Sequence, residues 1–334
     1  MPVRATSAVA TLALTVLACG GAIAIKPPEH PPSSDAIKQL WVDPGGEARD
    51  LFWGIGGQKY APDARAVYKF KERDATGFST KYEVKGPQDV EWSAKIGPEA
   101  QTEVVMSRIL WGLGYHQQPI YYLPSWTLER NGVKTTESEA RFRPKLKEFH
   151  RLDEYWWWQQ NPFVSTPELN GLLVVLLMFN STDLKNDNNS IYTFEQSMEG
   201  APRWFVVRDL GAALGETGKM YPRRNCLECF EQHRFITAIE GQHVEFDYVG
   251  RHQELISMIR PSDVRWAGQL MAKLTDKQWH DAFRAANYST ADAERYIARM
   301  KQKIDDALAL IREHRAAWLA AQSNEPLTAR YDRA

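Results

Sequence analysis

The chain has 334 residues, with 41 Lys and Arg against 42 Asp and Glu and a formal net charge of −1. This length suits two domains or one large two-lobed domain, and a chain that is 25% charged and 43% hydrophobic is globular rather than disordered. Near-neutral charge provides no basic field, so we expect no nucleic-acid partner, and three cysteines exclude a disulfide-stapled mini-protein.

Residues 1–24 read as an export signal. Arg4 provides a short positive start, and the apolar run over residues 8–18 is shorter than the roughly 20 residues that span a bilayer. Small residues up to Ala24 fit a cleavage site, whereas the residues before Cys19 resemble a lipoprotein signal in which that cysteine is lipidated. Both alternatives stay open, beside an uncleaved apolar N-terminus. The sequence therefore predicts a bacterial protein that is exported, either periplasmic or lipid-anchored at the cell envelope.

The next residues predict a spacer and then a small sheet. Residues 26–35 are rich in proline and read as an extended spacer, so residues 25–63 are predicted to be a spacer and an N-terminal extension. Residues 66–71 alternate between apolar and polar side chains. Similar runs over residues 81–84 and 90–96 follow, each after a turn that contains glycine. These three runs predict an antiparallel meander.

A helix is expected to follow the meander. Proline suits the first position of a helix, so the helix starts near Pro98, and glycine stops it near Gly112. Two further strand-like runs cover residues 120–123 and 139–142. These elements predict a β-rich N-lobe over residues 64–145.

The second half, residues 146–325, reads as mostly helical. A capping box precedes residues 169–179, which are apolar all round and predict a buried core helix rather than a membrane span. Residues 190–194 and 204–207 read as a short strand pair, and residues 262–322 are helical again. A β-rich lobe followed by an α-helical lobe predicts an α+β fold with a cleft between the lobes.

Two charged motifs lie where the predicted buried helix and the strand pair end. The first is Asp183-Leu-Lys185-x-x-Asn188, and the second is Asp209-Leu-Gly211. They resemble the catalytic loop D-L-K-x-x-N and the metal-binding D-F-G of the protein-kinase-like superfamily. The resemblance covers both predicted lobes and implies the two-lobed protein-kinase-like fold.

Upstream positions extend the resemblance. Ser93-Ala-Lys95 matches the family's A-x-K strand, and Glu103 lies on the helix behind it, where the family places the acidic partner of the lysine. Glu99 competes for that role, although an acidic residue in the first turn of a helix is also explained by the helix dipole. The position of the family's glycine-rich loop is taken by Gly77, Phe78 and Ser79.

The resemblance implies ATP and Mg²⁺ as cofactors. Phosphoryl transfer from ATP depends on positioning and charge neutralisation, so a lysine must hold the inner phosphates and a carboxylate must hold that lysine. Lys95 and Glu103 would form this pair, and backbone N–H groups in the turn from Gly77 to Ser79 would cradle phosphates. Asn188 and Asp209 offer the hard oxygen ligands that Mg²⁺ prefers.

Two residues of the first motif are expected to act in the chemistry. Asp183 would orient or deprotonate an acceptor hydroxyl, and Lys185 would offset charge on the moving phosphoryl group. The predicted function is an exported kinase-like phosphotransferase with a protein or small-molecule acceptor. Two alternatives stay open: an inactive pseudokinase that serves as a scaffold at the envelope, for which the scarcity of periplasmic ATP argues, and a kinase-fold enzyme that transfers AMP.

Departures from the family pattern limit what carries over. Thr182 replaces the histidine before the catalytic aspartate, and the phosphate loop keeps a single glycine. Lys95 and Glu103 are only eight residues apart, a spacing more like that of atypical kinases of the HipA, CotH and phosphoinositide-kinase types. No A-P-E triad follows Gly211, so peptide recognition is not implied.

Two other clusters attract attention. Cys226 and Cys229 precede His233 with the spacing of metal ligands, but a zinc site needs a fourth ligand, and a local disulfide is the alternative in an exported protein. A cross-link at this place, after Gly211, would stiffen or gate the cleft. The aromatic run over residues 155–158 is either a stacking platform or, as we favour, packing between the lobes.

Overall fold

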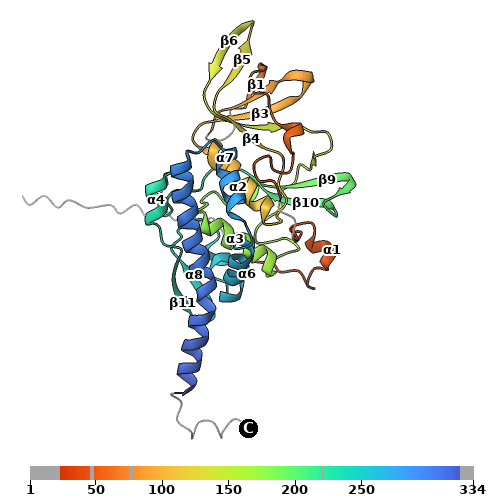
Figure 1. The fold of residues 1–334 in the computed structure, drawn as a ribbon. Helices are drawn as coiled ribbons and strands as arrows, with labels where there is room; N and C mark the ends of the chain where they lie inside the picture. The colour runs from red at the N-terminus through yellow and green to blue at the C-terminus, as the bar shows by residue number, and fades with distance from the viewer. Residues whose placement is uncertain (1–22, 46–48, 75–78, 220, 324–334) are drawn as a thin grey trace, which may run out of the picture.

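The computed structural model describes residues 23–45, 49–74, 79–219 and 221–323 (Figure 1). The strands are β1 (Val67–Asp74), β2 (Lys81–Lys85), β3 (Glu91–Ile96), β4 (Tyr121–Leu123), β5 (Trp126–Arg130), β6 (Val133–Glu137), β7 (Ala140–Pro144), β8 (His150–Arg151), β9 (Asn189–Met198), β10 (Ala201–Val207), β11 (Ile236–Glu240) and β12 (His243–Phe246). The α-helices are α1 (Ser34–Ile37), α2 (Glu99–Gly112), α3 (Pro167–Met178), α4 (Leu227–Gln232), α5 (Gln253–Ile256), α6 (Pro261–Met271), α7 (Asp276–Ala285) and α8 (Thr290–Ser323). Short 3-10 turns are η1 (Gln58–Tyr60), η2 (Pro87–Asp89) and η3 (Asn186–Asn188).

The β-rich lobe is a seven-stranded sheet in the order β4-β7-β3-β2-β1-β5-β6. The pairs β1–β2 and β2–β3 are antiparallel, so the predicted meander is confirmed. The hairpin β5–β6 is missing from our sequence-based prediction, and β5 lies parallel to β1. The turn between β5 and β6 is formed by Asn131 and Gly132. Their φ angles of 53° and 78° are positive, as in the turn of a typical Asn-Gly hairpin.

One face of this sheet forms its own hydrophobic core. Alternate residues of a strand point to opposite faces, so the apolar positions of neighbouring strands gather on one side. The buried side chains there include Tyr68, Val84, Trp92, Ala94 and Phe142. Aromatic contacts among them, such as the tilted pair of Tyr68 and Phe142 at 4.9 Å, hold the sheet in shape.

The helical lobe is built around α3, which packs with α6 and α8 below the sheet in Figure 1. Thr166 caps α3 by accepting a hydrogen bond from the Leu169 N–H, whereas the predicted capping box Ser165-Thr-Pro-Glu168 placed Ser165 at the N-cap. The residues from Leu172 to Met178 are all buried, which confirms the predicted core helix. None of the helices in the described part of the chain is both long and apolar enough to cross a membrane.

The hydrophobic core of the helical lobe, called the large core below, also includes side chains from segments outside that lobe. Helix α2, which we assigned to the N-lobe, buries Val105 and Ile109 in this core. Leu40 and Leu51 of the N-terminal extension are also buried there, and the Lys26 N–H donates to the Gln159 carbonyl at 2.9 Å. Residues 25–63 therefore pack against the lobes over much of their length, beyond the spacer that their proline content suggests.

The two-lobed α+β fold is thus as predicted, and its elements follow the order that the kinase-like resemblance implied. The loop after α3 and the loop after β10 meet between the lobes, because β9 and β10 pair up to Asn189 and Val207. The predicted export signal, including Cys19, lies almost wholly within residues 1–22, outside the described residues.

Candidate active site

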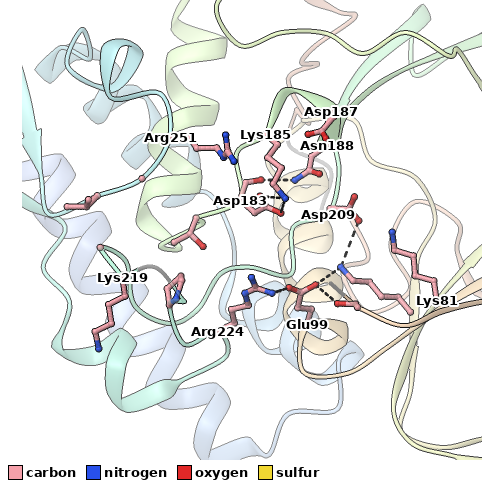
Figure 2. A pocket seen from close by; sticks show the side chains of 17 residues that line it. Lys81, Glu99, Asp183, Lys185, Asp187, Asn188, Asp209, Lys219, Arg224 and Arg251 are labelled. Atoms are coloured by element: carbon pink, nitrogen blue, oxygen red, sulfur yellow. Dashed lines mark hydrogen bonds and ion pairs between the residues drawn. The ribbon is translucent and has the colours of Figure 1, made fainter. Parts of the chain in front are cut away.

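A cavity of about 620 Å³ lies between the two lobes (Figure 2). The sheet and the start of α2 form one wall, and the loops of the helical lobe form the other. Its lining includes the loop after α3, the aspartate after β10, and two later segments around residues 218–224 and 249–251. The lining residues that matter below are Ser79, Lys81, Lys95, Glu99, Thr182, Asp183, Lys185, Asn188, Asp209, Lys219, Pro222, Arg224, Val249 and Arg251.

The first motif forms the loop that follows α3. Leu184 is buried in the core, so the side chains on either side of it face the cavity. The Lys185 Nζ lies 3.0 Å from an Asp183 carboxylate oxygen. The Asn188 side-chain amide donates to the Asp183 carbonyl at 2.8 Å. Because its nitrogen is used in this bond, the amide oxygen of Asn188 is left for another partner.

Thr182 stands where the resembled family has a histidine. Its backbone N–H and its hydroxyl both donate to the Ala212 carbonyl, at 2.9 and 3.2 Å. This residue therefore joins the loop after α3 to the segment that follows Gly211.

The second motif turns the chain sharply at the end of β10. Asp209 has a φ of 52°, a left-handed conformation that Asp tolerates better than most residues. Leu210 is buried in the core, and the Arg208 N–H donates to the Asn188 carbonyl at 3.2 Å. The two motifs are thus bonded to one another, with Asn188 and Asp209 both on the cavity lining.

Lys95 is the centre of an ion-pair cluster beside Asp209. Its Nζ lies 2.6 Å from Glu99, 3.1 Å from Glu103 and 3.9 Å from Asp209. Burial lowers the pKa of Lys95, but the surrounding carboxylates of Glu103, Glu99 and Asp209 outweigh it and raise that pKa. We expected Glu103 in preference to Glu99, whereas Lys95 contacts both. One turn of α2 separates the two glutamates, so they present their carboxylates to the same lysine.

The carboxylates of this cluster are held ionised by more than one cation. Burial raises the pKa of Glu103, and the charges of Arg141 and Lys95 more than offset this and lower it. Arg141 Nε lies 3.0 Å from the Glu103 carboxylate. Burial likewise raises the pKa of Asp209, and Lys95, Arg208, Arg143 and Arg141 together lower it below its ordinary value.

Glu99 connects three parts of the cavity wall. It accepts a hydrogen bond from the Ser79 hydroxyl at 2.9 Å and pairs with Arg224 from the segment after the second motif. Figure 2 shows Arg224 reaching toward Glu99 across the cavity floor. Ser79 is the part of the predicted phosphate loop that the structure describes; Gly77 and Phe78 lie outside the described residues.

The residues at the predicted metal site suit Mg²⁺ chemically. They offer one ionised carboxylate, Asp209, and one amide oxygen, Asn188, on the same cavity wall. Among the described residues there is no group of three or more His, Cys, Asp or Glu that could hold a metal ion by itself. Mg²⁺ usually keeps several waters and is shared with substrate phosphates, so one or two protein ligands are the expected number.

Several cations of the site were missed from the sequence. Arg141 and Arg143 alternate on β7, and Arg208 directly precedes the second motif, a position that could have drawn attention. Lys219, Arg224 and Arg251 come from loops that carry no motif, so their place at the cavity follows only from the tertiary fold. The predicted residues Lys95, Glu103, Asp183, Lys185, Asn188 and Asp209 are brought together; all but the buried Glu103 line the cavity.

The remaining two clusters have structural places. Cys226 and Cys229 form a disulfide at the start of α4, so the zinc alternative is wrong for these cysteines. Of the aromatic run, Trp156 and Trp158 are buried and pack edge to face at 4.8 Å, while Tyr155 and Trp157 are exposed. The buried pair belongs to the large core, as we favoured.

Comparisons with known proteins give similarity to kinase structures at low identity. The crystal structure of the Helicobacter pylori proinflammatory kinase CtkA is 11% identical, with a TM-score of 0.44, over 75% of this chain and 99% of that one. The crystal structure of the Golgi casein kinase is 10% identical, with a TM-score of 0.36, over 76% of this chain and 74% of that one. No protein-family model and no curated protein matches the sequence.

Proposed function

We propose that this protein is a kinase-like phosphotransferase that binds ATP with Mg²⁺ in the cavity between its lobes and transfers a phosphoryl group to a hydroxyl acceptor. One observation carries the proposal: the ion-pair cluster around Lys95 reaches Asp209 at 3.9 Å, in the same cavity that Asp183, Lys185 and Asn188 line. A lysine held by buried carboxylates, an ionised aspartate and a second aspartate beside a lysine are the groups that phosphoryl transfer needs.

Each group has a role that its surroundings support. Lys95 would hold the inner phosphates, since Glu99 and Glu103 keep it charged and in place. Asp209 and the amide oxygen of Asn188 would hold Mg²⁺, which supplies charge neutralisation for the phosphates when bound.

The acceptor side of the site is formed by the first motif. Asp183 would accept the proton of the acceptor hydroxyl as that oxygen attacks, and Lys185, 3.0 Å away, would stabilise negative charge on the phosphoryl group. Because the two side chains already pair in the structure, the base and the stabilising cation lie side by side at one end of the cavity.

The export of the protein belongs to the same proposal. The signal in residues 1–24 is supported by the Cys226–Cys229 disulfide, because disulfides persist in oxidising compartments beyond the inner membrane. We place the protein in the periplasm or at the envelope through a lipid on Cys19.

Thermal unfolding of the full chain tests the proposal. We expect Mg²⁺ with ATP at about 100 times the dissociation constant to stabilise the protein by roughly 2.7 kcal/mol, a shift of a few degrees. Asp209→Ala should lose the metal-dependent shift, because it removes the carboxylate that would hold Mg²⁺. Asp183→Ala should keep the shift and lose phosphoryl transfer, because it removes the base and not the binding groups.

Asp305→Ala, an exposed aspartate on α8, is the matched control and should behave like the parent. If neither the parent nor the control is stabilised by Mg²⁺ and ATP, the proposal is wrong, and a scaffold protein without nucleotide becomes the better description. Transfer from α-labelled rather than γ-labelled ATP would instead identify AMP as the group that moves.

A further inference from the structure

The face of the sheet that looks into the cavity is polar in every row. Lys81 and Lys95 line the cavity from neighbouring strands and pair directly across β2 and β3, and Arg141 of β7 continues the same row. Residues two positions along a strand lie on the same face. The next row on this face is therefore the following set: Glu83, Ser93 and Arg143.

This polar face contrasts with the opposite side of the same strands. There the alternate positions Val84, Trp92, Ala94 and Phe142 form the hydrophobic core of the sheet. Most aromatic and aliphatic side chains of the sheet therefore lie on the far face, and the face toward the cavity has charged and hydroxyl groups with Tyr122 of β4 at the end of the first row.

Two of these polar side chains have unmet hydrogen-bonding groups. Arg141 is fully buried; its Nη1 donates to the Ser93 carbonyl at 3.0 Å, while its Nη2 has no hydrogen-bond partner among the described residues. Ser93 is 2% exposed, and its hydroxyl likewise has no hydrogen-bond partner within the described part of the chain. Neither side chain lines the cavity, and Arg141 Nε pairs with Glu103 at 3.0 Å, so these two residues form a buried polar layer behind Lys95.

The rest of the wall is charged as well, with the carboxylates of Asp183, Asp187 and Asp209 beside four cations. Lys185, Lys219, Arg224 and Arg251 line the cavity from the helical lobe, and Figure 2 shows Arg251 and Lys185 directed toward the same space. Among the described residues, the apolar side chains of the lining are Pro222 and Val249, both on the loops of the helical lobe.

The cavity lining has many charged side chains and few apolar ones. This composition favours the phosphates, rather than the base, as the part of a nucleotide that is recognised. A nucleobase gains affinity by stacking on aromatic or aliphatic faces, whereas phosphates gain it from charged donors such as Arg and Lys. Of the two rows of the sheet, Lys81 and Lys95 line the cavity as cationic donors, and the apolar residues Val84, Trp92 and Phe142 lie on the other face.

We propose that the cavity binds its donor through the triphosphate chain with Mg²⁺ and does not select the base. The ligand class is then any tripolyphosphate, with or without a nucleoside: ATP, GTP, CTP and inorganic tripolyphosphate are bound alike. This inference rests on the proposed phosphotransferase function and narrows it, since it names the chemical part of the donor that the protein recognises.

Titration calorimetry on the full chain in excess MgCl₂ tests this inference, with each of the four ligands in turn. We expect dissociation constants within about threefold of one another. ATP that binds about tenfold or more tightly than both GTP and tripolyphosphate would show a base-selective slot and overturn the inference, while the proposed function would stand. Binding of none of the four overturns both.

A variant pair separates phosphate recognition from general attraction to a cation-rich cavity. Lys81→Gln removes a lysine of the cavity wall whose side chain is 20% exposed, so the variant should fold. We expect it to weaken all four ligands by the same factor, about fivefold to tenfold. Lys134→Gln, at an exposed position on β6, is the control and should leave them unchanged. A loss confined to the nucleotides would contradict the inference.

Discussion

Gly211 lies against the first turn of α2, and this contact explains why a glycine ends the second motif. A Cβ at this position would meet the Glu99 Cβ at 2.5 Å and the Glu99 carbonyl at 2.9 Å. Both are closer than real Cβ atoms come, and the carbonyl belongs to the helix backbone, which cannot move aside easily. The absence of a side chain here lets the chain after Asp209 pass directly beneath the carboxylate that holds Lys95.

We expect Gly211→Ala to destabilise the protein by about 1–3 kcal/mol, as overpacking of a tight site usually does. It should also weaken Mg²⁺-dependent nucleotide binding, because Glu99 must shift away from Lys95. Denaturant unfolding and calorimetry measure the two effects. Gly132→Ala, in the exposed β5–β6 turn, meets no atom within 4 Å and controls for backbone strain alone. Unchanged Mg²⁺-dependent nucleotide binding in Gly211→Ala would contradict the steric argument.

The sequence was informative for single residues that belong to a motif. The spacing of Asp183, Asn188 and Asp209 was enough to assign them to one site, because a motif records which positions converge in space. The sequence could not decide whether Glu99 or Glu103 contacts Lys95, because the two glutamates are one helical turn apart on the same face of α2. Nor could it find Arg224, whose approach to Glu99 depends on how a loop more than a hundred residues away returns to the cavity.

The segment between the second motif and α4 is fastened to α2 at several points. Arg224 pairs with Glu99, and the Asn225 side-chain amide donates to Gln101 at 3.1 Å. The Cys226 N–H donates to the Leu214 carbonyl at 2.8 Å, and the Cys226–Cys229 disulfide closes the first turn of α4. The cross-link therefore adjoins the residues that position one wall of the cavity.

Reduction of this disulfide should loosen the Arg224 contact and weaken Mg²⁺-ATP binding by about threefold to tenfold, the range of a modest coupling between two sites. Calorimetry with and without a thiol reductant measures the change. The paired variant Cys226→Ser with Cys229→Ser should bind like the reduced parent and no longer respond to the reductant. Identical affinity of the oxidised and reduced parent would show that the cross-link has no influence on the cavity.

At the scale of secondary structure, the sequence predicted the strands and helices whose own residues show a clear apolar pattern or a capping signal. The strands β1, β2 and β3 alternate in sequence, and the polar residues before α3 marked its start to within one residue, because its N-cap is Thr166 and the predicted one was Ser165. The hairpin β5–β6 was missed although β5 alternates, with Trp126 and Leu128 buried, and its Asn131-Gly132 turn is a strong signal. Its second strand, β6, is polar and exposed and has no apolar alternation. The parallel pairing of β1 with β5 joins residues about 60 positions apart, and no pattern within either strand encodes it.

At the scale of the whole molecule, the N-terminal extension is part of the folded body. Leu40 and Leu51 are buried in the large core, and the Trp41 indole N–H donates to the Leu113 carbonyl at 2.8 Å. Arg49 donates to the Trp111 carbonyl at 2.6 Å. The sequence predicted a proline-rich spacer over residues 26–35 followed by an N-terminal extension, and composition does not tell which apolar side chains of that extension become buried.

Truncation of one buried side chain tests whether the N-terminal extension contributes to the stability of the folded protein. Leu51 is fully buried against α2, so Leu51→Ala should lower the free energy of unfolding by about 2–5 kcal/mol through lost burial and a new cavity. Denaturant unfolding provides the measurement. Val133→Ala is the control, because Val133 is 64% exposed and should cost little. A similar small effect for both would mean that the extension is attached but contributes little to stability.

The short connection between β3 and α2 has a consequence for how this protein can be controlled. β3 ends at Ile96 and α2 begins at Glu99, so only Gly97 and Pro98 separate them. A helix tied so closely to a strand cannot rotate outward and carry Glu103 away from the lysine without unwinding its own first turn. We therefore expect on–off control to act from the opposite wall, where loops border the cavity, rather than by a swing of α2.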